Sequence, residues 1–299
     1  MHVLTLIGAP GTSALTPAML DALSQRVAAR GGKPGTPDWL APGEACDLPF
    51  DGMSPATALA EAKALLADAT LDIFAQPVAG RRKAVFLADM ESTIIAQEML
   101  DELAAAAKLG PKIAEITALS MAGKLDFDAA LDERAALLKG LPCDLLDRLS
   151  DGMTLNPGAA TLVKTLRAAG SYCALVTGGF DVFADRIGAQ CGFHEVRANH
   201  LETRDGRLCG RVSRPILGPR GKLEALQDIT AARGLGVEDA CAVGDGANDL
   251  AMLQTAGLGV AFRGKPLLRR RIQPLLDHGD LTGILYLQGY RRTEFHTAA

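Results

Sequence analysis

The sequence has few aromatic residues and no concentration of positive charge. Aromatic residues make up 4% of the chain, with a single tryptophan, and they do not alternate with basic residues. Lysines and arginines are scattered, and the formal net charge is -4. Nucleic-acid binding relies on aromatic stacking platforms or on a dense basic surface. We therefore expect no nucleic-acid partner.

Paired cysteines and long apolar runs are also lacking. The six cysteines are far apart and form no C-x-x-C pair or Cys/His cluster of the zinc type, so we expect reduced, mostly buried thiols. No apolar stretch approaches the roughly 18 residues of a membrane span. The opening MHVLTLIGAPG has no basic segment and is interrupted by Pro10-Gly11, unlike a secretion signal. These features predict a cytoplasmic protein with no membrane partner.

The first 80 residues are predicted to form a small α+β domain. Ser54-Pro55 is typical of a helix start, with serine as the cap and proline in the first turn. The segment GAPGTS resembles a phosphate loop but lacks the lysine of that motif. The expected order is strand 3–7, helix 17–30, weak strands near Trp39 and at 46–50, helix 56–68 and strand 71–78. This β-α-β-β-α-β order is that of a split βαβ unit.

Three short apolar runs indicate a second type of architecture after the basic linker 80–83. They are AVFLA before Asp89, CALV before Thr177 and ACAV before Gly244. Continuous apolar strands are typical of parallel sheets buried on both faces. With helices expected at 158–169 and 222–233, the pattern predicts a doubly wound α/β sheet. Ligands of such sheets bind at the carboxyl ends of the strands.

The first two of these runs are separated by far more residues than one crossover helix needs. Four helical patterns fill this interval. An inserted helical cap at about 97–155 is the simplest explanation, and long insertions of this kind commonly serve as lids.

Two acids follow the first run, in the segment ADMESTII. In an extended segment, Asp89 and Glu91 at positions i and i+2 point to the same side and repel each other. A cation or a proton between them would relieve that repulsion. The alternative is a pair of solvated turn residues.

Polar residues also occupy the later strand ends. In VTGGF, Thr177 and the glycines Gly178 and Gly179 suit a phosphate, because glycines let backbone N–H groups approach closely. The GDGAND segment supplies carboxylate and amide oxygens that suit Mg²⁺, although a helix-capping turn has the same composition. Lys222, at a helix start, is by default a surface lysine.

Together these motifs resemble the haloacid dehalogenase superfamily of phosphatases, and more narrowly its phosphoserine phosphatases. The resemblance covers about residues 81–290, and three cap segments favour the serine branch. These segments are IIAQEMLDELA, GKLDF and RAALLKGLP. Residues 1–80 resemble only loosely the ACT-type regulatory module of some bacterial relatives, and 291–299 are left as a tail. The resemblance implies a Mg²⁺-dependent hydrolase of phosphoserine that completes serine biosynthesis.

The resemblance also implies roles for individual residues. Asp89 would be the nucleophile that forms an aspartyl-phosphate, and Glu91 the acid-base group. Mg²⁺ would be held by Asp89, Asp245, Asp249 and the backbone carbonyl of Glu91. The phosphate would be held by Thr177, Gly178, Gly179, Lys222 and Asn248.

In the cap, the resemblance implies that Glu98 binds the substrate ammonium, Arg134 its carboxylate, and Phe127 covers the site. For Glu98 and Arg134 the alternative is a solvated helix face. Two residues depart from the family pattern: Glu91 stands where aspartate is usual, and Thr177 where serine is common.

Other functions fit the same motifs. The phosphoryl group could pass to an alcohol instead of water, or the substrate could be another small phosphomonoester. A protein of a different class, an amino-acid sensor with an inactive phosphatase half, would result if Glu91 abolished activity. The sequence does not determine the oligomeric state, and a homodimer is compatible with it.

Overall fold

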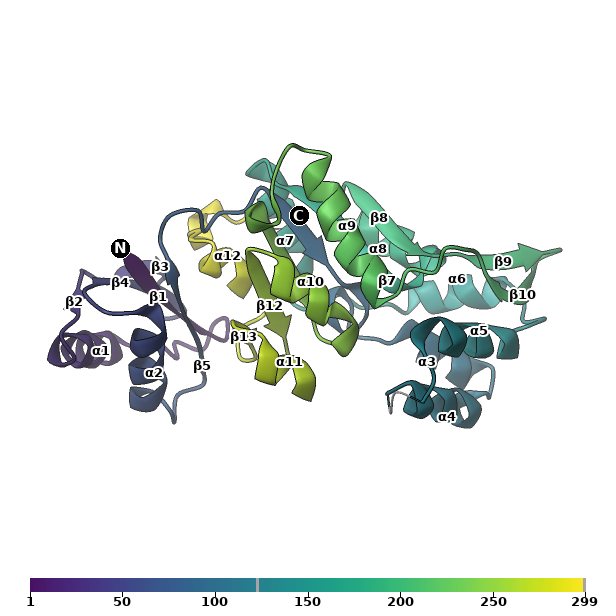
Figure 1. Cartoon of the computed structure of the whole chain (residues 1–299), viewed down its shortest axis with the longest axis horizontal. Helices are drawn as coiled ribbons and strands as arrows, with labels where there is room; N and C mark the ends of the chain where they lie inside the picture. Colours follow the sequence, from purple (N-terminus) through teal and green to yellow (C-terminus); the bar gives the residue numbers. More distant parts are fainter. Residues whose placement is uncertain (122–123, 298–299) are drawn as a thin grey trace.

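A computed structural model describes residues 1–121 and 124–297 (Figure 1). The molecule is elongated, with an N-terminal sheet at one end, a central sheet, and the helices of an insertion at the other end. Residues 122–123, which include the glycine of GKLDF, and residues 298–299 of the expected tail lie outside the described range.

The N-terminal unit is an antiparallel sheet with two helices. Its strand order is β2-β4-β1-β5, and β3 also pairs with β4. As predicted, Ser54 caps the second helix and accepts the Thr57 N–H at 3.1 Å. The elements are β1 His2–Gly8, α1 Pro17–Ala29, β2 Lys33–Pro34, β3 Asp38–Ala41, β4 Ala45–Asp51, α2 Pro55–Leu65 and β5 Leu71–Pro77. The β-α-β-β-α-β prediction agrees with this order, apart from the additional short strand. An ACT-like identity stays a prediction.

The central sheet is parallel, in the order β13-β12-β11-β6-β7-β8. Its strands are β6 Val85–Ala88, β7 Tyr172–Phe180, β8 Glu195–Asn199, β11 Ala240–Gly244, β12 Leu258–Phe262 and β13 Leu275–Leu276. Every residue of β6, β11 and β12 is buried. This confirms the doubly wound α/β class, since such burial requires layers on both faces.

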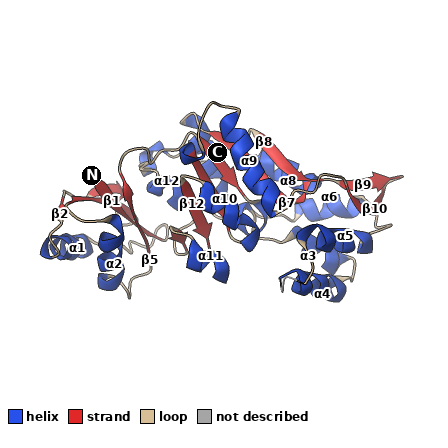
Figure 2. Cartoon of the chain, viewed as in Figure 1, coloured by secondary structure: helices blue, strands red, loops and turns tan. Residues whose placement is uncertain are grey.

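Helices cover both faces of the sheet, as Figure 2 shows. In β6, Val85 packs with residues of α9 and α10, whereas Phe86 packs with residues of α7 and α8. The helices are α7 Ala159–Ala168, α8 Asp181–Cys191, α9 Pro219–Ala231, α10 Leu250–Thr255, α11 Pro266–Arg271 and α12 Gly283–Leu287, and the short 3₁₀ turns are η2 Val237–Asp239, η3 Ala247–Asp249 and η4 Arg292–Glu294.

The segment between β6 and β7 is helical, as predicted. After the wide turn η1 Met90–Ile94, the cap consists of α3 Met99–Ala106, α4 Gly110–Met121, α5 Phe127–Leu137 and α6 Asp144–Asp151. An unpredicted hairpin, β9 Leu201–Arg204 and β10 Arg207–Val212, packs on α5: Leu208 of the hairpin shares a buried cluster with Leu131. The cap is thus supported by a second, later segment of the chain.

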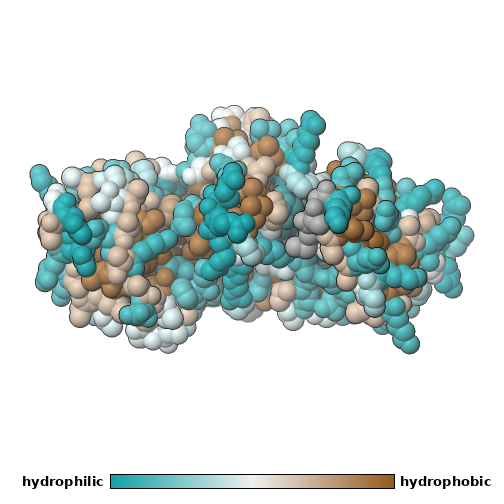
Figure 3. Space-filling view, turned by 60° about the horizontal axis from the view of Figure 1, so that its bottom comes forward, coloured by the Kyte–Doolittle hydropathy of each residue, from teal (hydrophilic) through white to brown (hydrophobic). Residues whose placement is uncertain are grey.

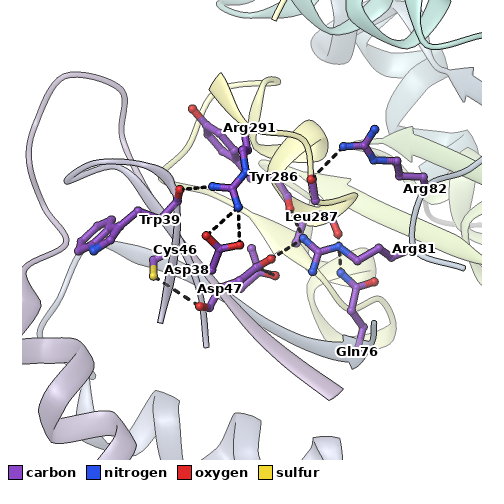
Figure 4. A network of polar contacts seen from close by, with 12 residues as sticks. Asp38, Trp39, Cys46, Asp47, Gln76, Arg81, Arg82, Tyr286, Leu287 and Arg291 are labelled. Atoms are coloured by element: carbon purple, nitrogen blue, oxygen red, sulfur yellow. Dashed lines mark hydrogen bonds and ion pairs between the residues drawn. The ribbon is translucent and has the colours of Figure 1, made fainter. Parts of the chain in front are cut away.

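Polar contacts join the N-terminal sheet to the C-terminal segment (Figure 4). Arg81, in the predicted linker, is largely buried and pairs with Asp47 at 2.6 Å. Beyond α12, Arg291 pairs with Asp38 at 2.7 Å. Asp72 of β5 accepts backbone N–H groups of residues 277–279 at 2.8–2.9 Å. Both the linker and the start of the expected tail are therefore attached to the N-terminal sheet by ion pairs.

Figure 3 shows hydrophilic residues interspersed with apolar ones along one face of the molecule. Among the described residues, no helix combines the length and the apolar character needed to cross a membrane. All six cysteines are free thiols, as predicted, and Cys46, Cys173, Cys191 and Cys241 are buried.

Candidate active site

The carboxyl ends of β6, β7 and β11 meet beneath the cap at a cavity of about 530 Å³. All predicted site residues except Lys222 and Asp249 line it: Asp89, Glu91, Glu98, Phe127, Arg134, Thr177, Gly178, Gly179, Asp245 and Asn248. Residues far apart in the sequence are brought together because parallel strands end at one edge of the sheet.

Asp89 is held in a fixed orientation directly after β6. Its N–H donates to the carbonyl of Val243 on β11 at 3.0 Å. Its Oδ1 accepts the Met90 N–H at 2.8 Å and lies 2.7 Å from Lys222 Nζ. Asp89 and Glu91 both line the cavity, but they do not belong to one extended segment, because Met90 between them has helical backbone angles.

Lys222 is fully buried, so the default interpretation as a surface lysine is wrong. From the first turns of α9 it lies 2.7 Å from both Asp89 Oδ1 and Asp249 Oδ1. Burial lowers the pKa of Lys222, but Asp249 and Asp89 outweigh it and raise the pKa above its usual range. Lys222 therefore carries a permanent charge between two acids that would otherwise repel each other.

Three carboxylates form the cluster best suited to a cation. Oxygen atoms of Asp89, Asp245 and Asp249 lie within 4.8 Å of one another, and all three residues are buried. Burial and Asp89 raise the pKa of Asp249 to about 7, and burial also raises the pKa of Asp245. Three buried carboxylates carry more negative charge than the neighbouring lysines balance. Their oxygen atoms are the type of ligand that a hard divalent ion such as Mg²⁺ prefers.

The side chain of Glu91 points elsewhere, toward the first turn of the cap. Its Oε1 accepts the Met99 N–H at 2.8 Å. Burial, Glu98 and Asp89 raise the pKa of Glu91 to about 8, so it holds a proton at neutral pH in the metal-free protein. A Cβ at Gly179 would lie 2.8 Å from Glu91 Oε2, so a larger residue there would displace the Glu91 carboxyl group from its present position.

The Thr-Gly-Gly segment is fixed by contacts that the sequence did not predict. Thr177 Oγ1 accepts the Gly179 N–H at 3.0 Å. Asn199 donates to the Gly178 carbonyl at 2.9 Å and accepts the Leu217 N–H at 2.7 Å. Asn199 belongs to no motif, and no local signal in the sequence marks it. Its amide keeps the loop that precedes α9 against the end of β7.

Two charged residues of the cap face the same cavity. Glu98 Oε1 accepts from Ser92 Oγ at 2.8 Å and lies 3.3 Å from Lys265 Nζ. Arg134 is partly buried and donates from Nε to the Ala130 carbonyl at 3.0 Å. Burial lowers the pKa of Arg134. Both residues line the cavity, where a ligand could reach them. This position favours a binding role over the alternative of a solvated helix face.

A family model of haloacid dehalogenase-like hydrolases matches residues 86–254. The chain belongs to this family. A phosphoserine phosphatase of Streptomyces coelicolor is 40% identical to it over 243 residues, which are 81% of this chain and 59% of the relative. The chain thus spans about three fifths of that relative's length.

Solved structures of the family are similar along the chain. A haloacid dehalogenase family hydrolase of Salmonella enterica has a TM-score of 0.84 at 29% identity, covering 97% of this chain and 99% of that one. A phospho-aspartyl intermediate analogue of phosphoserine phosphatase has a TM-score of 0.64 at 36% identity, covering 69% and 98%. The resemblance predicted from the motifs is confirmed.

The cavity of this family member also contains residues that were not predicted. Ser92, Asp101, Thr117 and Lys265 line it. Ser92 and Asp101 lie inside the segments that carry the resemblance. Because they are close to Glu91 and Glu98 in the sequence, they could have been predicted as site residues. Lys265 follows β12, a strand that was not predicted, so no strand end marks it in the sequence.

Proposed function

We propose that the protein hydrolyses O-phospho-L-serine to L-serine and phosphate, through an aspartyl-phosphate on Asp89 and with Mg²⁺ as cofactor. The observation that carries the proposal is that one cavity is lined by the acid pair, the Thr-Gly-Gly segment and the charged cap residues Glu98 and Arg134. The names of the Streptomyces relative and of the phospho-aspartyl structure support the same reaction.

The first step transfers the phosphoryl group to the protein. A carboxylate oxygen of Asp89 forms a bond to phosphorus as the bond from phosphorus to the serine oxygen breaks. Glu91 gives its proton to the departing oxygen. Its raised pKa, about 8, suits a group that must be protonated at this point, since catalytic acids work best with a pKa near the ambient pH.

The second step releases phosphate. Glu91, now ionised, takes a proton from a water molecule whose oxygen bonds to phosphorus, and the bond to Asp89 breaks. During both steps the phosphoryl oxygens need positive or hydrogen-bonding groups around them. Lys222 supplies a fixed charge 2.7 Å from Asp89, and Thr177 and Gly178 supply donors at the end of β7.

Asp89, Asp245 and Asp249 would hold the metal ion, whose charge would offset the repulsion between these acids and the phosphate dianion. Substrate choice depends on the residues of the cap. Phosphoserine carries an ammonium and a carboxylate beyond its phosphate. Glu98 and Arg134 have the complementary charges, and Phe127 packs over Gly178 and Gly218, closing the apolar side.

Phosphate release from phosphoserine, phosphothreonine, glucose 6-phosphate and p-nitrophenyl phosphate tests the proposal, with Mg²⁺ and after exhaustive chelation. We expect phosphoserine to have the highest kcat/KM and chelation to abolish turnover. Asp89→Asn should form no phospho-enzyme, because an amide oxygen is a poor nucleophile. Full activity without metal, or preference for a sugar phosphate, would contradict the proposal. Product analysis with added homoserine separates hydrolysis from transfer to an alcohol.

A further inference from the structure

Lys265 joins a carboxylate of the central sheet to a carboxylate at the start of the cap. Its Nζ lies 3.0 Å from Asp245 Oδ2 and 3.3 Å from Glu98 Oε1. Its backbone N–H donates to the Asp245 carbonyl at 2.8 Å, which fixes the loop between β12 and α11 beside the site. The side chain is 50% exposed, so its ammonium lies at the mouth of the cavity and can move into solvent.

The two partners of Lys265 are the carboxylates that the proposed function assigns to other cations. Asp245 is assigned to Mg²⁺, and Glu98 to the substrate ammonium. A Mg²⁺ ion on Asp245 would bind the same carboxylate that lies 3.0 Å from Lys265 Nζ. An ammonium on Glu98 would likewise bind a carboxylate that Lys265 already contacts. Like charges placed on one carboxylate repel appreciably near a protein surface.

We propose that Lys265 is an exchangeable cation that couples the binding of Mg²⁺ to the binding of an ammonium-bearing substrate. Without ligands it pairs with both Asp245 and Glu98, and both Mg²⁺ and a substrate ammonium displace it. The inference rests on the proposed function. The first cation to bind expels Lys265 and removes the same obstacle for the second. Binding of Mg²⁺ and of an ammonium-bearing ligand is therefore positively coupled, and the coupling is reciprocal.

The other lysine of the site cannot act in this way. Lys222 is enclosed between Asp89 and Asp249 and has no exposed path to leave them. Of the two lysines described at the site, Lys265 is therefore the one that can exchange with a ligand cation. A phosphomonoester without an ammonium does not compete for Glu98, so it gains nothing from the exchange. Its binding is therefore not coupled to that of Mg²⁺ through Lys265.

The first test is calorimetric titration of Mg²⁺ into the metal-free protein. Lys265→Gln should bind Mg²⁺ roughly 2- to 5-fold more tightly than wild type, within the range for removing a partly exposed ion pair. Lys265→Arg keeps the charge and should bind like wild type. Arg271→Gln removes an equal charge from a separate cleft beside β12 and should change the Kd less than twofold. Equal or weaker Mg²⁺ binding by Lys265→Gln overturns the proposal.

The second test repeats the titrations with saturating L-serine, the ammonium-bearing product. Serine should lower the Mg²⁺ Kd of wild type and of Lys265→Arg. The coupling is measured by the Mg²⁺ Kd without serine divided by the Kd with serine, and this ratio should be at least twofold smaller in Lys265→Gln than in wild type. An unchanged ratio in Lys265→Gln overturns the coupling. If serine does not bind to wild type, the phosphoserine assignment fails, whereas the titrations without serine still decide the displacement of Lys265 by Mg²⁺.

Discussion

The Glu91 carboxylate accepts a hydrogen bond from the backbone N–H of Met99, with 2.8 Å between the two atoms. Met99 begins α3, the first helix of the cap, and the N–H groups of a helix start have no acceptors within the helix. The acid that follows β6 is thereby attached to the element that covers the site. A shorter aspartate at this position would have to reach the same N–H with one methylene fewer.

This contact gives the first prediction, for variants of Glu91. Glu91→Ala should lower kcat on phosphoserine by about 10²- to 10⁴-fold, the usual contribution of a positioned acid-base group. Glu91→Asp keeps the carboxylate but moves it away from Met99, so its kcat should be reduced yet remain well above that of the alanine variant. Steady-state kinetics measures both. Wild-type turnover by Glu91→Ala would leave Glu91 as an ordinary turn acid.

The pH dependence of stability provides a second prediction. Glu91 has a pKa of about 8 in the folded metal-free protein, raised from 4.5 by burial, Glu98 and Asp89. Between these values the folded state binds more protons at Glu91 than the unfolded state does. Its contribution to stability is therefore complete below about pH 4.5 and is lost as the pH rises through 8.

Glu91→Gln, which mimics the protonated acid, should not lose this contribution. Thermal melts in chelator from pH 4.5 to 9 should show the Tm of the variant rising relative to wild type as the pH increases. Parallel Tm curves over this range would mean that Glu91 titrates normally.

The strand ends are predictable from the sequence because each motif follows an apolar run, and parallel strands place such motifs at one edge of the sheet. Asp89, Thr177 and Asp245 can be grouped on that basis alone. Helix periodicity also locates the insertion. The resemblance to a known family then selects Glu98 and Arg134 from many charged residues with the same helical spacing.

Other parts depend on tertiary placement that local sequence does not encode. Lys222 turns inward only because Asp89 and Asp249 approach from two other segments. The hairpin that supports the cap does have a local signal: Asp205-Gly206, both with positive φ, is the turn dipeptide of a two-residue hairpin loop. The residues that flank this turn alternate only weakly between polar and apolar, so periodicity predicts no strands there.

A third prediction concerns the buried lysine. Lys222→Met leaves Asp89 and Asp249 without their shared cation, and breaking a buried ion pair costs about 3–5 kcal/mol of folding stability. Mg²⁺ should raise the Tm of this variant more than that of wild type, because the same carboxylates would bind it. Differential scanning calorimetry with and without Mg²⁺ measures the difference. Lys112→Met, an exposed lysine of α4, is the control, and an equal response in all three proteins would contradict the prediction.

A fourth prediction tests substrate recognition by the cap. Arg134→Ala should lower kcat/KM for phosphoserine. The decrease should correspond to a loss of about 2–4 kcal/mol of transition-state stabilisation, as expected when one member of a desolvated charge pair is removed. Activity on p-nitrophenyl phosphate, which has no carboxylate beyond its phosphate, should change little. Arg148→Ala removes an exposed arginine of α6 and serves as the control. Equal losses on both substrates would make Arg134 a structural residue.

The last prediction concerns the junction between the two sheets. Asp72 accepts three backbone N–H groups, from Asp277, His278 and Gly279, and it is buried. Asp72→Ala leaves these donors without their acceptor, at about 1–3 kcal/mol for each group that stays buried. We expect lower stability and faster amide hydrogen exchange at residues 277–279. Asp72→Asn retains one acceptor oxygen and should lie between wild type and alanine.

Asp51→Ala is the matched control, because Asp51 is an exposed aspartate of the same N-terminal sheet and pairs with the chain terminus. It should leave exchange at residues 277–279 unchanged. Since Asp277 also pairs with Arg269 of α11 at 2.6 Å, loss of Asp72 frees a loop that still has one anchor, and exchange should increase without unfolding α11. Unchanged protection at residues 277–279 in Asp72→Ala would show that Asp72 does not hold the two sheets together.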